Sequence, residues 1–278
     1  MIDLHTHSTC SDGSEPPERV VDLAKQAGCR AIALTDHDGC FGLAAARGRA
    51  ESIGMRFVPG CEVSCTHRTI SLHLLCYFVD ETSRSFDELL QVVRRDRDER
   101  NRAIDERLGE LGMAVSLDDA TAEAKGEVVG RPHFAAVLVR RGMANSIEDA
   151  FDRWLGDGRP AYVARTPLPP GRVIDAARQD GGVVALAHPL SSGKEFARLA
   201  LLVDELAEMG LAGLEAYYAT YDEKTHAQLV ELARSHGLVP TGGSDFHGEY
   251  RPGIRVGVGA GDLDVPDAIL DELEDHRR

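Results

Sequence analysis

The stretch that decides the fold lies at the start of the chain, at residues 3–7, and reads Asp3-Leu4-His5-Thr6-His7. Side chains two residues apart on a strand point to the same side, so His5 and His7 can bind one metal ion together. A second pair, Asp245 and His247, follows the apolar run at residues 237–241 near the other end of the chain. A parallel α/β barrel places the first and last strands side by side, with their ends converging at one mouth. We therefore expect both pairs in one metal site, which predicts a metallohydrolase.

Strand and helix signals alternate in the first third of the chain and again after residue 170. Strands are predicted at residues 1–7, 29–35, 55–59, 71–79, 182–187, 214–217 and 237–241. Helices are predicted between them, at residues 15–28, 39–54, 171–180, 194–209 and 222–237. Such alternation implies a parallel sheet whose functional side chains lie at the carboxyl ends of the strands.

The middle of the chain breaks the alternation. Residues 85–166 are helical in pattern and highly charged, without a convincing strand–helix–strand unit. We expect an inserted helical subdomain at 85–166 between the two parts of the barrel domain, 1–84 and 167–278. The charged run at residues 94–100 is interpreted as a solvated helix face with ion pairs, not as a nucleic-acid groove.

Composition limits the classes of function. The 278 residues are 43% hydrophobic and 28% charged, as in a soluble globular protein, with a net charge of −15. This charge excludes broad binding of duplex DNA, but divalent cations in a pocket would still allow a short phosphorylated substrate. No apolar run approaches the roughly 18 residues of a membrane span, and no secretory leader is visible. Six scattered cysteines without a Cys-x-x-Cys pair agree with a cytoplasmic location.

Nearly every predicted strand end carries a side chain able to bind a metal. The nine candidates are His5, His7, Asp12, His37, Glu62, His73, His188, Asp245 and His247. A single histidine of this kind is more often a cap or a satisfied interior residue. Six of the eleven histidines placed this way are hard to explain by chance, however. Imidazole with carboxylate and no thiolate suits Zn²⁺, Mn²⁺ or Fe²⁺.

The order and spacing of these residues resemble the PHP (polymerase and histidinol phosphatase) family over residues 1–80 and 170–260. Four segments carry the resemblance: His5-Thr6-His7 with Ser11-Asp12-Gly13, Thr35-Asp36-His37-Asp38, Ala187-His188-Pro189 and Ser244-Asp245-Phe246-His247. The segment around Glu62 and the strand with His73 fit as well, and residues 130–135 resemble the TrpH-like branch. The resemblance implies a distorted (β/α)₇ TIM-like barrel that holds two to three divalent metals for phosphoester hydrolysis.

The resemblance also implies roles for the nine residues. It assigns His5, His7, Glu62 and Asp245 to a first metal, Glu62 with His73 and His188 to a second, and Asp12, His37 and His247 to a third. An attacking water would be held by Glu62, His188, Asp245 and His247. Several relatives have a histidine in place of Asp12, so the carboxylate here favours Mn²⁺ over Zn²⁺ or Fe²⁺. Asp36 and Asp38 are interpreted as orienting groups beside His37.

The leading expectation for the substrate is a nucleoside 3′,5′-bisphosphate, losing its 3′-phosphate to give a nucleoside 5′-monophosphate. Trimming of short 5′-phosphorylated RNA from the 5′ end is a further expectation. Arg131, His133 and Lys194 are the candidates for binding the phosphate that does not react. Structural readings stay open: Arg131 pairs within the insert, His133 begins a helix, and Lys194 is solvated.

Other functions stay open at this point. A histidinol-phosphate phosphatase would use the same metal ligands, and an amidohydrolase acting on a non-phosphate substrate also opens with His-x-His. That second class usually has a bridging lysine, where Glu62 stands here. The oligomeric state is left open. Tyr217, Tyr218 and Tyr221 are expected to pack against the barrel, and stacking on a base is the alternative.

Overall fold

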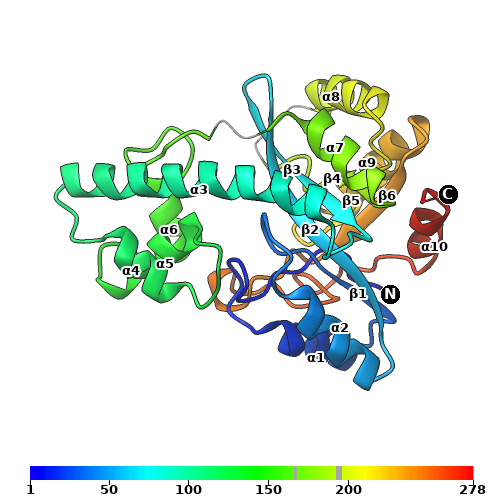
Figure 1. Ribbon diagram of the computed structural model, residues 1–278, viewed down its shortest axis with the longest axis horizontal. Helices are drawn as coiled ribbons and strands as arrows, with labels where there is room; N and C mark the ends of the chain where they lie inside the picture. Colours follow the sequence, from blue (N-terminus) through cyan, green and yellow to red (C-terminus); the bar gives the residue numbers. More distant parts are fainter. Residues whose placement is uncertain (166–167, 192–195, 278) are drawn as a thin grey trace.

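The computed structural model describes residues 1–165, 168–191 and 196–277 and has a mixed α/β fold (Figure 1). Its strands form one curled six-stranded sheet in the order β1-β2-β3-β4-β5-β6. Their bounds are β1 Ala31–Leu34, β2 Arg56–His67, β3 Ile70–Tyr77, β4 Val183–Leu186, β5 Gly213–Tyr218 and β6 Val239–Gly243. Each predicted strand from residue 29 onward therefore has a counterpart.

The sheet is mixed, and the expectation of a parallel sheet is wrong for β3. Pairing is parallel between β1 and β2, β4 and β5, and β5 and β6, but β3 is antiparallel to both of its neighbours. The cause is the length of β2, which continues to His67 and pairs there with Ile70. The two residues between them can form only a tight hairpin, because a parallel crossover needs a dozen residues or more. Arg68, with a φ of 55°, makes that turn.

The N-terminal segment lies between β1 and the chain that follows β6. Asp3 pairs in parallel with Ile32 of β1, and Thr6 pairs in parallel with Phe246 beyond β6. These are isolated bridges, so residues 1–7 do not form the continuous strand that the sequence predicts. The two ends of the chain are nevertheless adjacent, as the sequence analysis expects.

Six helices accompany the sheet in the described part of the chain: α1 Pro17–Ala27, α2 Leu43–Ser52, α7 Pro170–Gln179, α8 Phe196–Glu208, α9 Glu223–Ser235 and α10 Ala268–Asp275. A short 3₁₀-helix covers Gly248–Tyr250. Strand residues alternate between two apolar clusters, as the period of two requires. Ile32 and Leu34 of β1 join the cluster that α1, α2, α7, α8 and α9 cover, whereas Ala31 and Ala33 join the cluster on the opposite face, which α10 covers.

The helical region comprises α3 Arg84–Glu110, α4 Leu117–Glu123, α5 Arg131–Arg140, α6 Ile147–Ala150 and a π-helix, Phe151–Leu155. Figure 1 shows the long α3 running from the sheet, with α4, α5 and α6 gathered beside its far half. These helices have an apolar cluster of their own, which includes Ile104, Leu108, Phe134 and Leu138. Within residues 1–165, 168–191 and 196–277, no helix is both long and apolar enough to pass through a membrane.

Candidate metal centre

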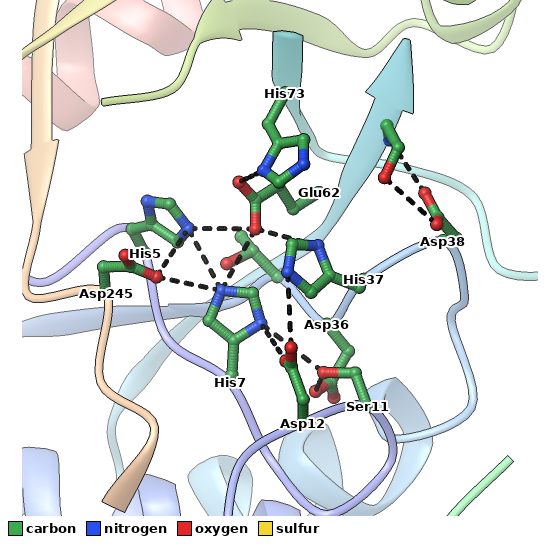
Figure 2. Close-up of polar contacts among 12 residues, drawn as sticks. His5, His7, Ser11, Asp12, Asp36, His37, Asp38, Glu62, His73 and Asp245 are labelled. Atoms are coloured by element: carbon green, nitrogen blue, oxygen red, sulfur yellow. Dashed lines mark hydrogen bonds and ion pairs between the residues drawn. The ribbon is translucent and has the colours of Figure 1, made fainter. Parts of the chain in front are cut away.

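The structure brings together all nine side chains that the sequence suggested as metal ligands. Figure 2 shows seven of them facing a common centre: His5, His7, Asp12, His37, Glu62, His73 and Asp245. The other two reach the same centre, because His188 Nε2 lies 2.9 Å from Glu62 Oε1 and His247 Nε2 lies 3.3 Å from Asp12 Oδ1. Segments from both termini therefore meet in one site.

The first group consists of His5, His7, Glu62 and Asp245, whose ligand atoms all lie within 4.8 Å of one another. The two Nε2 atoms are 3.1 Å apart, and each lies 3.2–3.3 Å from Glu62 Oε2 and Asp245 Oδ1. Ligands about 2.0–2.1 Å from a tetrahedral ion are roughly 3.3–3.4 Å apart. The spacing therefore fits a single divalent cation.

Glu62 joins this group to a second one. Its Oε1 lies 2.9 Å from His73 Nδ1 and 2.9 Å from His188 Nε2, while its Oε2 lies 3.1 Å from His37 Nδ1. One carboxylate therefore faces several imidazoles with both oxygens, as a ligand that bridges two ions would.

A third group gathers around Asp12. Its carboxylate lies 3.3 Å from His247 Nε2, 3.6 Å from His37 Nε2 and 3.8 Å from His7 Nδ1. These contacts are longer than those around Glu62, but the four ligand atoms still lie within 4.8 Å of one another. His7 and His37 each present one ring nitrogen to this group and the other to Glu62.

Unsatisfied polar atoms support metal binding at this centre. Asp12 Oδ1, His37 Nδ1 and Glu62 Oε2 are buried and form no hydrogen bond with the described residues. Leaving such atoms unpaired is unfavourable, and a bound cation would satisfy them. The donor set is six imidazoles and three carboxylates without a thiolate, which fits divalent ions that prefer nitrogen and oxygen.

The electrostatics also favour a cation. Burial by itself raises the pKa of Glu62, but His37, His73 and His5 outweigh it and hold that pKa well below its usual value. Burial lowers the pKa of His7, but Asp245 and Glu62 outweigh it and raise the pKa to about 10. Ionised carboxylates therefore attract positive charge to the imidazole nitrogens.

Glu215 on β5 positions two of the histidines, and the sequence analysis missed it. Its Oε1 accepts a hydrogen bond from His5 Nδ1 at 2.9 Å, and its Oε2 accepts one from the backbone N–H of His188 at 2.5 Å. The bond to Nδ1 selects the tautomer in which Nε2 of the neutral ring is the nitrogen without a proton, and Nε2 is directed at the metal group. The available signal was a glutamate inside an apolar strand, where a charged side chain is rarely buried without a partner.

The two aspartates beside His37 hold neighbouring segments. Asp36 accepts hydrogen bonds from the hydroxyls of Ser8 and Ser11, both at 2.6 Å, and so fixes the loop that carries Asp12. Asp38 accepts one from the backbone N–H of Ser64 at 2.7 Å and pairs with two arginines described below.

Three residues of the site have a backbone conformation that is rare for residues other than glycine. Asp38, His188 and Asp245 have φ values of 52°, 26° and 52°, in the left-handed region that non-glycine residues rarely adopt. Such strain persists where surrounding contacts determine the conformation, and it concentrates at functional sites. Gly243 permits the final approach, because a Cβ atom there would overlap the backbone nitrogen of His5.

Asp245 is held by two side chains that the sequence analysis did not assign to the site. Tyr218 Oη donates a hydrogen bond to Asp245 Oδ2 at 2.7 Å, and Arg251 Nη1 donates another to the same oxygen at 2.5 Å. The other oxygen, Oδ1, faces His5 and His7. Tyr218 is buried as expected, and its hydrogen bond to Asp245 is a further contact that the sequence does not predict.

A pocket of about 690 Å³ opens over the metal-binding groups. The opposite wall comes from the helical region and carries four arginines: Arg97, Arg100, Arg131 and Arg165. The interpretation of residues 94–100 as a solvated face is therefore wrong for Arg97 and Arg100, which are only 5% and 6% exposed. They lie on the side of α3 that faces the pocket, whereas Arg95, Asp98 and Glu99 are exposed.

The three candidate substrate-binding residues have different positions. Arg131 lines the pocket, with its guanidinium 5.5 Å from the centre of the Phe151 ring. His133 lies in the first turn of α5, as the structural alternative predicts. Its Nδ1 accepts a hydrogen bond from the backbone N–H of Gly130 at 2.9 Å. It is not among the described residues that line the pocket. Lys194 lies outside the described residues.

Comparison with known proteins identifies the family. The model of the PHP domain matches residues 3–156, more than half of the chain. The chain belongs to the PHP domain family. Its fold is shared by a putative metal-dependent phosphoesterase from Bifidobacterium adolescentis, with a TM-score of 0.88, 29% identity, and coverage of 99% of this chain and 96% of that one.

Three relatives with curated names cover nearly the whole chain. The 5′-3′ exoribonuclease Rnm of Escherichia coli is 33% identical over 92% of this chain and 88% of its own. The 3′,5′-nucleoside bisphosphate phosphatase of Chromobacterium violaceum is 30% identical over 92% and 90%. A phosphoribosyl 1,2-cyclic phosphate 1,2-diphosphodiesterase of Eggerthella lenta is 32% identical over 92% and 97%. This PHP protein is therefore a metal-dependent phosphoric ester hydrolase, and its substrate is left to a proposal.

Proposed function

We propose that this PHP protein removes the 3′-phosphate from nucleoside 3′,5′-bisphosphates, and that it also trims short 5′-phosphorylated RNA from the 5′ end. The observation that carries the proposal is the single pocket in which the metal-binding groups face a wall of arginines. A substrate with two phosphates suits such a pocket, since one can lie at the metals and the other at the guanidinium groups.

The two activities share one arrangement of groups. A nucleoside 3′,5′-bisphosphate and the first nucleotide of a 5′-phosphorylated RNA both carry a 5′-phosphate and a phosphate ester on O3′. The relatives named as a bisphosphate phosphatase and as a 5′-3′ exoribonuclease support the proposal that one site accepts both. The negative surface agrees with a short substrate and disfavours duplex DNA.

We assign the metals as the family resemblance implies, with Mn²⁺ as the preferred ion. The first ion takes His5, His7, Glu62 and Asp245, the second takes Glu62, His73 and His188, and the third takes Asp12, His37 and His247. The contacts around Glu62 and Asp12 support this division. Bound divalent ions lower the pKa of a coordinated water and neutralise charge on the phosphoryl group.

The chain's own residues keep this arrangement rigid. Glu215 holds His5 in the tautomer that leaves Nε2 free to bind an ion. Tyr218 and Arg251 hold one oxygen of Asp245 and leave the other for the metal group. We propose that Glu62, His188, Asp245 and His247 surround the water that attacks phosphorus, with Arg131 as a contact for the second phosphate. The roles of His133 and Lys194 in substrate binding stay predictions.

The finer description of the fold is also a proposal. The bridges of Asp3 to β1 and of Thr6 to the chain beyond β6 support a seven-stranded distorted barrel that the N-terminal segment closes. The separate apolar cluster of α3 to α6 supports an inserted subdomain at 85–166 between barrel parts 1–84 and 167–278. A cytoplasmic location stays a prediction from the sequence.

The decisive experiment compares substrates under one set of conditions. The Mn²⁺-loaded protein is incubated with adenosine 3′,5′-bisphosphate, a 5′-phosphorylated oligoribonucleotide, histidinol phosphate and phosphoribosyl 1,2-cyclic phosphate. We expect phosphate release from the bisphosphate and 5′-nucleotide release from the RNA, both abolished by chelation and restored by Mn²⁺. Hydrolysis of histidinol phosphate or the cyclic phosphate alone would refute the proposed substrate. Activity that survives exhaustive chelation would refute the metal site itself.

A further inference from the structure

Arg100 on α3 is a buried cation in the pocket wall, and no carboxylate of the described residues forms an ion pair with it. It is 6% exposed and lines the same pocket as the metal-binding groups. Its Nε and Nη2 atoms are buried and form no hydrogen bond with the described part of the chain. A buried arginine normally has its donors paired, so these two require an explanation.

The neighbouring arginines are already engaged. Arg97 donates to Asp38 Oδ2 from Nε at 2.9 Å and from Nη2 at 2.5 Å, and Arg165 Nη1 reaches the same oxygen at 3.3 Å. Arg131 also has a partner within the helical region, because its Nη1 donates to the carbonyl oxygen of Leu155 at 3.3 Å, but its guanidinium still lines the pocket and can contact a phosphate. The single carboxylate of Asp38 is therefore shared by two guanidinium groups, whereas two buried donors of Arg100 have no partner among the described residues.

The charge around Arg100 favours binding of an anion. Burial, and then the guanidinium groups of Arg97, Arg165 and Arg131, lower the pKa of Arg100 well below its usual value. A buried charge among like charges is unfavourable unless a counter-charge enters the pocket. A planar guanidinium with adjacent free N–H groups matches two oxygens of a phosphate, and the pocket leads from Arg100 to the metal-binding groups.

We propose that Arg100 binds the phosphate of the substrate that is not hydrolysed, which is the 5′-phosphate if the proposed function is correct. Arg100 then determines specificity, because it makes a 5′-phosphate a requirement for both the mononucleotide and the RNA. Arg97 and Arg165 add positive charge to the same wall of the pocket while their ion pairs with Asp38 stay in place.

Kinetics with a matched pair of substrates test this proposal. Arg100→Met keeps the length of the side chain and removes its donors, and Arg102→Met is the control because Arg102 is exposed on the same helix. For adenosine 3′,5′-bisphosphate we expect R100M to raise KM by roughly 10- to 100-fold, the range for a lost charged hydrogen bond. We expect kcat to change less than about threefold, since Arg100 does not touch the reacting phosphate. For adenosine 3′-monophosphate, which lacks the 5′-phosphate, R100M and the unmodified protein should be equal.

A binding measurement separates this proposal from the proposed function. Calorimetric titration of the Mn²⁺-loaded protein with adenosine 5′-monophosphate should show an affinity that falls roughly 10- to 100-fold in R100M and is unchanged in R102M. Arg100→Lys keeps the charge and should lose less affinity than R100M. If the protein hydrolyses no nucleotide but this pattern appears, the proposed function fails and the anion site stands.

Two results would overturn the role of Arg100. One is an equal loss of kcat/KM on the 3′-monophosphate and on the bisphosphate in R100M. The other is an affinity for adenosine 5′-monophosphate that R100M does not change. Thermal unfolding adds a readout of a merely structural role: removal of a buried charge without a partner should not lower Tm, whereas loss of a structural contact would.

Discussion

Replacing Glu215 by glutamine should weaken metal binding without removing any of the nine proposed ligands. In the protein, one carboxylate oxygen accepts from His5 Nδ1 at 2.9 Å and the other accepts from the backbone N–H of His188 at 2.5 Å. A glutamine has only one oxygen. If that oxygen faces His188, the amide N–H₂ faces His5 and favours the tautomer whose Nε2 carries a proton and cannot bind a metal. If the glutamine oxygen faces His5, the amide N–H₂ group faces the backbone N–H of His188. Two donors then face each other, and neither has an acceptor.

The expected loss of metal affinity follows from the type of contact that is removed. Removing a buried partner of a metal-binding histidine lowers metal affinity by roughly 10- to 100-fold, or about 1.4–2.7 kcal/mol. Competition of the protein with a chromophoric chelator for Mn²⁺ measures this directly. Activity should recover as Mn²⁺ is raised, because all the ligands are still present.

Glu205→Gln is the matched control, since Glu205 is partly exposed and pairs with Arg68 away from the metal groups. It should leave Mn²⁺ affinity unchanged. Circular dichroism of both variants checks that the fold is intact. An E215Q protein that is folded and binds Mn²⁺ as tightly as the unmodified protein would refute the role assigned to Glu215.

Three further predictions address the same centre. Gly243→Ala should lower the free energy of unfolding by at least about 2 kcal/mol in urea titrations, because the new Cβ overlaps the backbone of His5. Binding of Mn²⁺ at pH 8 should release protons, since the pKa of His7 is about 10 without metal, and affinity should fall as pH falls. Calorimetry in two buffers of different ionisation enthalpy measures that release, and equal heats would contradict it. Asp38→Asn should destabilise the protein by about 3 kcal/mol or more, because Arg97 loses its buried carboxylate, and an unchanged Tm would contradict this.

The cluster of nine candidate ligands could be predicted from the sequence because their chemistry and their position coincide. A single histidine at the end of a strand often has a structural role, but six histidines and three carboxylates at successive strand ends are typical of a metal site. His5 and Asp245 could meet only if the first and last strands are neighbours. That inference needs no knowledge of side-chain contacts. Glu215 could not be assigned in the same way, because its function is to bond with His5 and His188, and a strand pattern does not show which residue lies opposite.

The antiparallel hairpin was missed because the end of β2 has no strong sequence signal. The sequence predicts a strand that ends at residue 59, whereas β2 continues to His67. The hairpin places His73 directly beside Ser64, two residues from Glu62, on the neighbouring strand. A crossover helix would have required many more residues than lie between these strands.

The buried arginines of α3 illustrate a signal that was present and was not used. Leu90, Val93, Ile104 and Leu108 form a buried stripe at helical spacing on this helix. Positions 97 and 100 continue the stripe, so the periodicity places both arginines on the buried face. Charge alone suggested solvent exposure. Arginines on the apolar face of an amphipathic helix are better read as partners of a buried anion or as ligands of an anionic substrate.

Asp38 connects the two walls of the pocket and so sets the distance between them. It follows the proposed ligand His37 directly in sequence, and its carboxylate binds Arg97 of α3 at 2.5 Å and Arg165 at 3.3 Å. Because Arg100 lies one helical turn after Arg97, this ion pair fixes Arg100 relative to the metal-binding groups. A shift of α3 by one turn would move the anion site by about 5.4 Å, which is comparable to the size of a ribose. A related enzyme whose substrate has a different distance between its two phosphates therefore needs a different register of α3. Its metal ligands can stay the same.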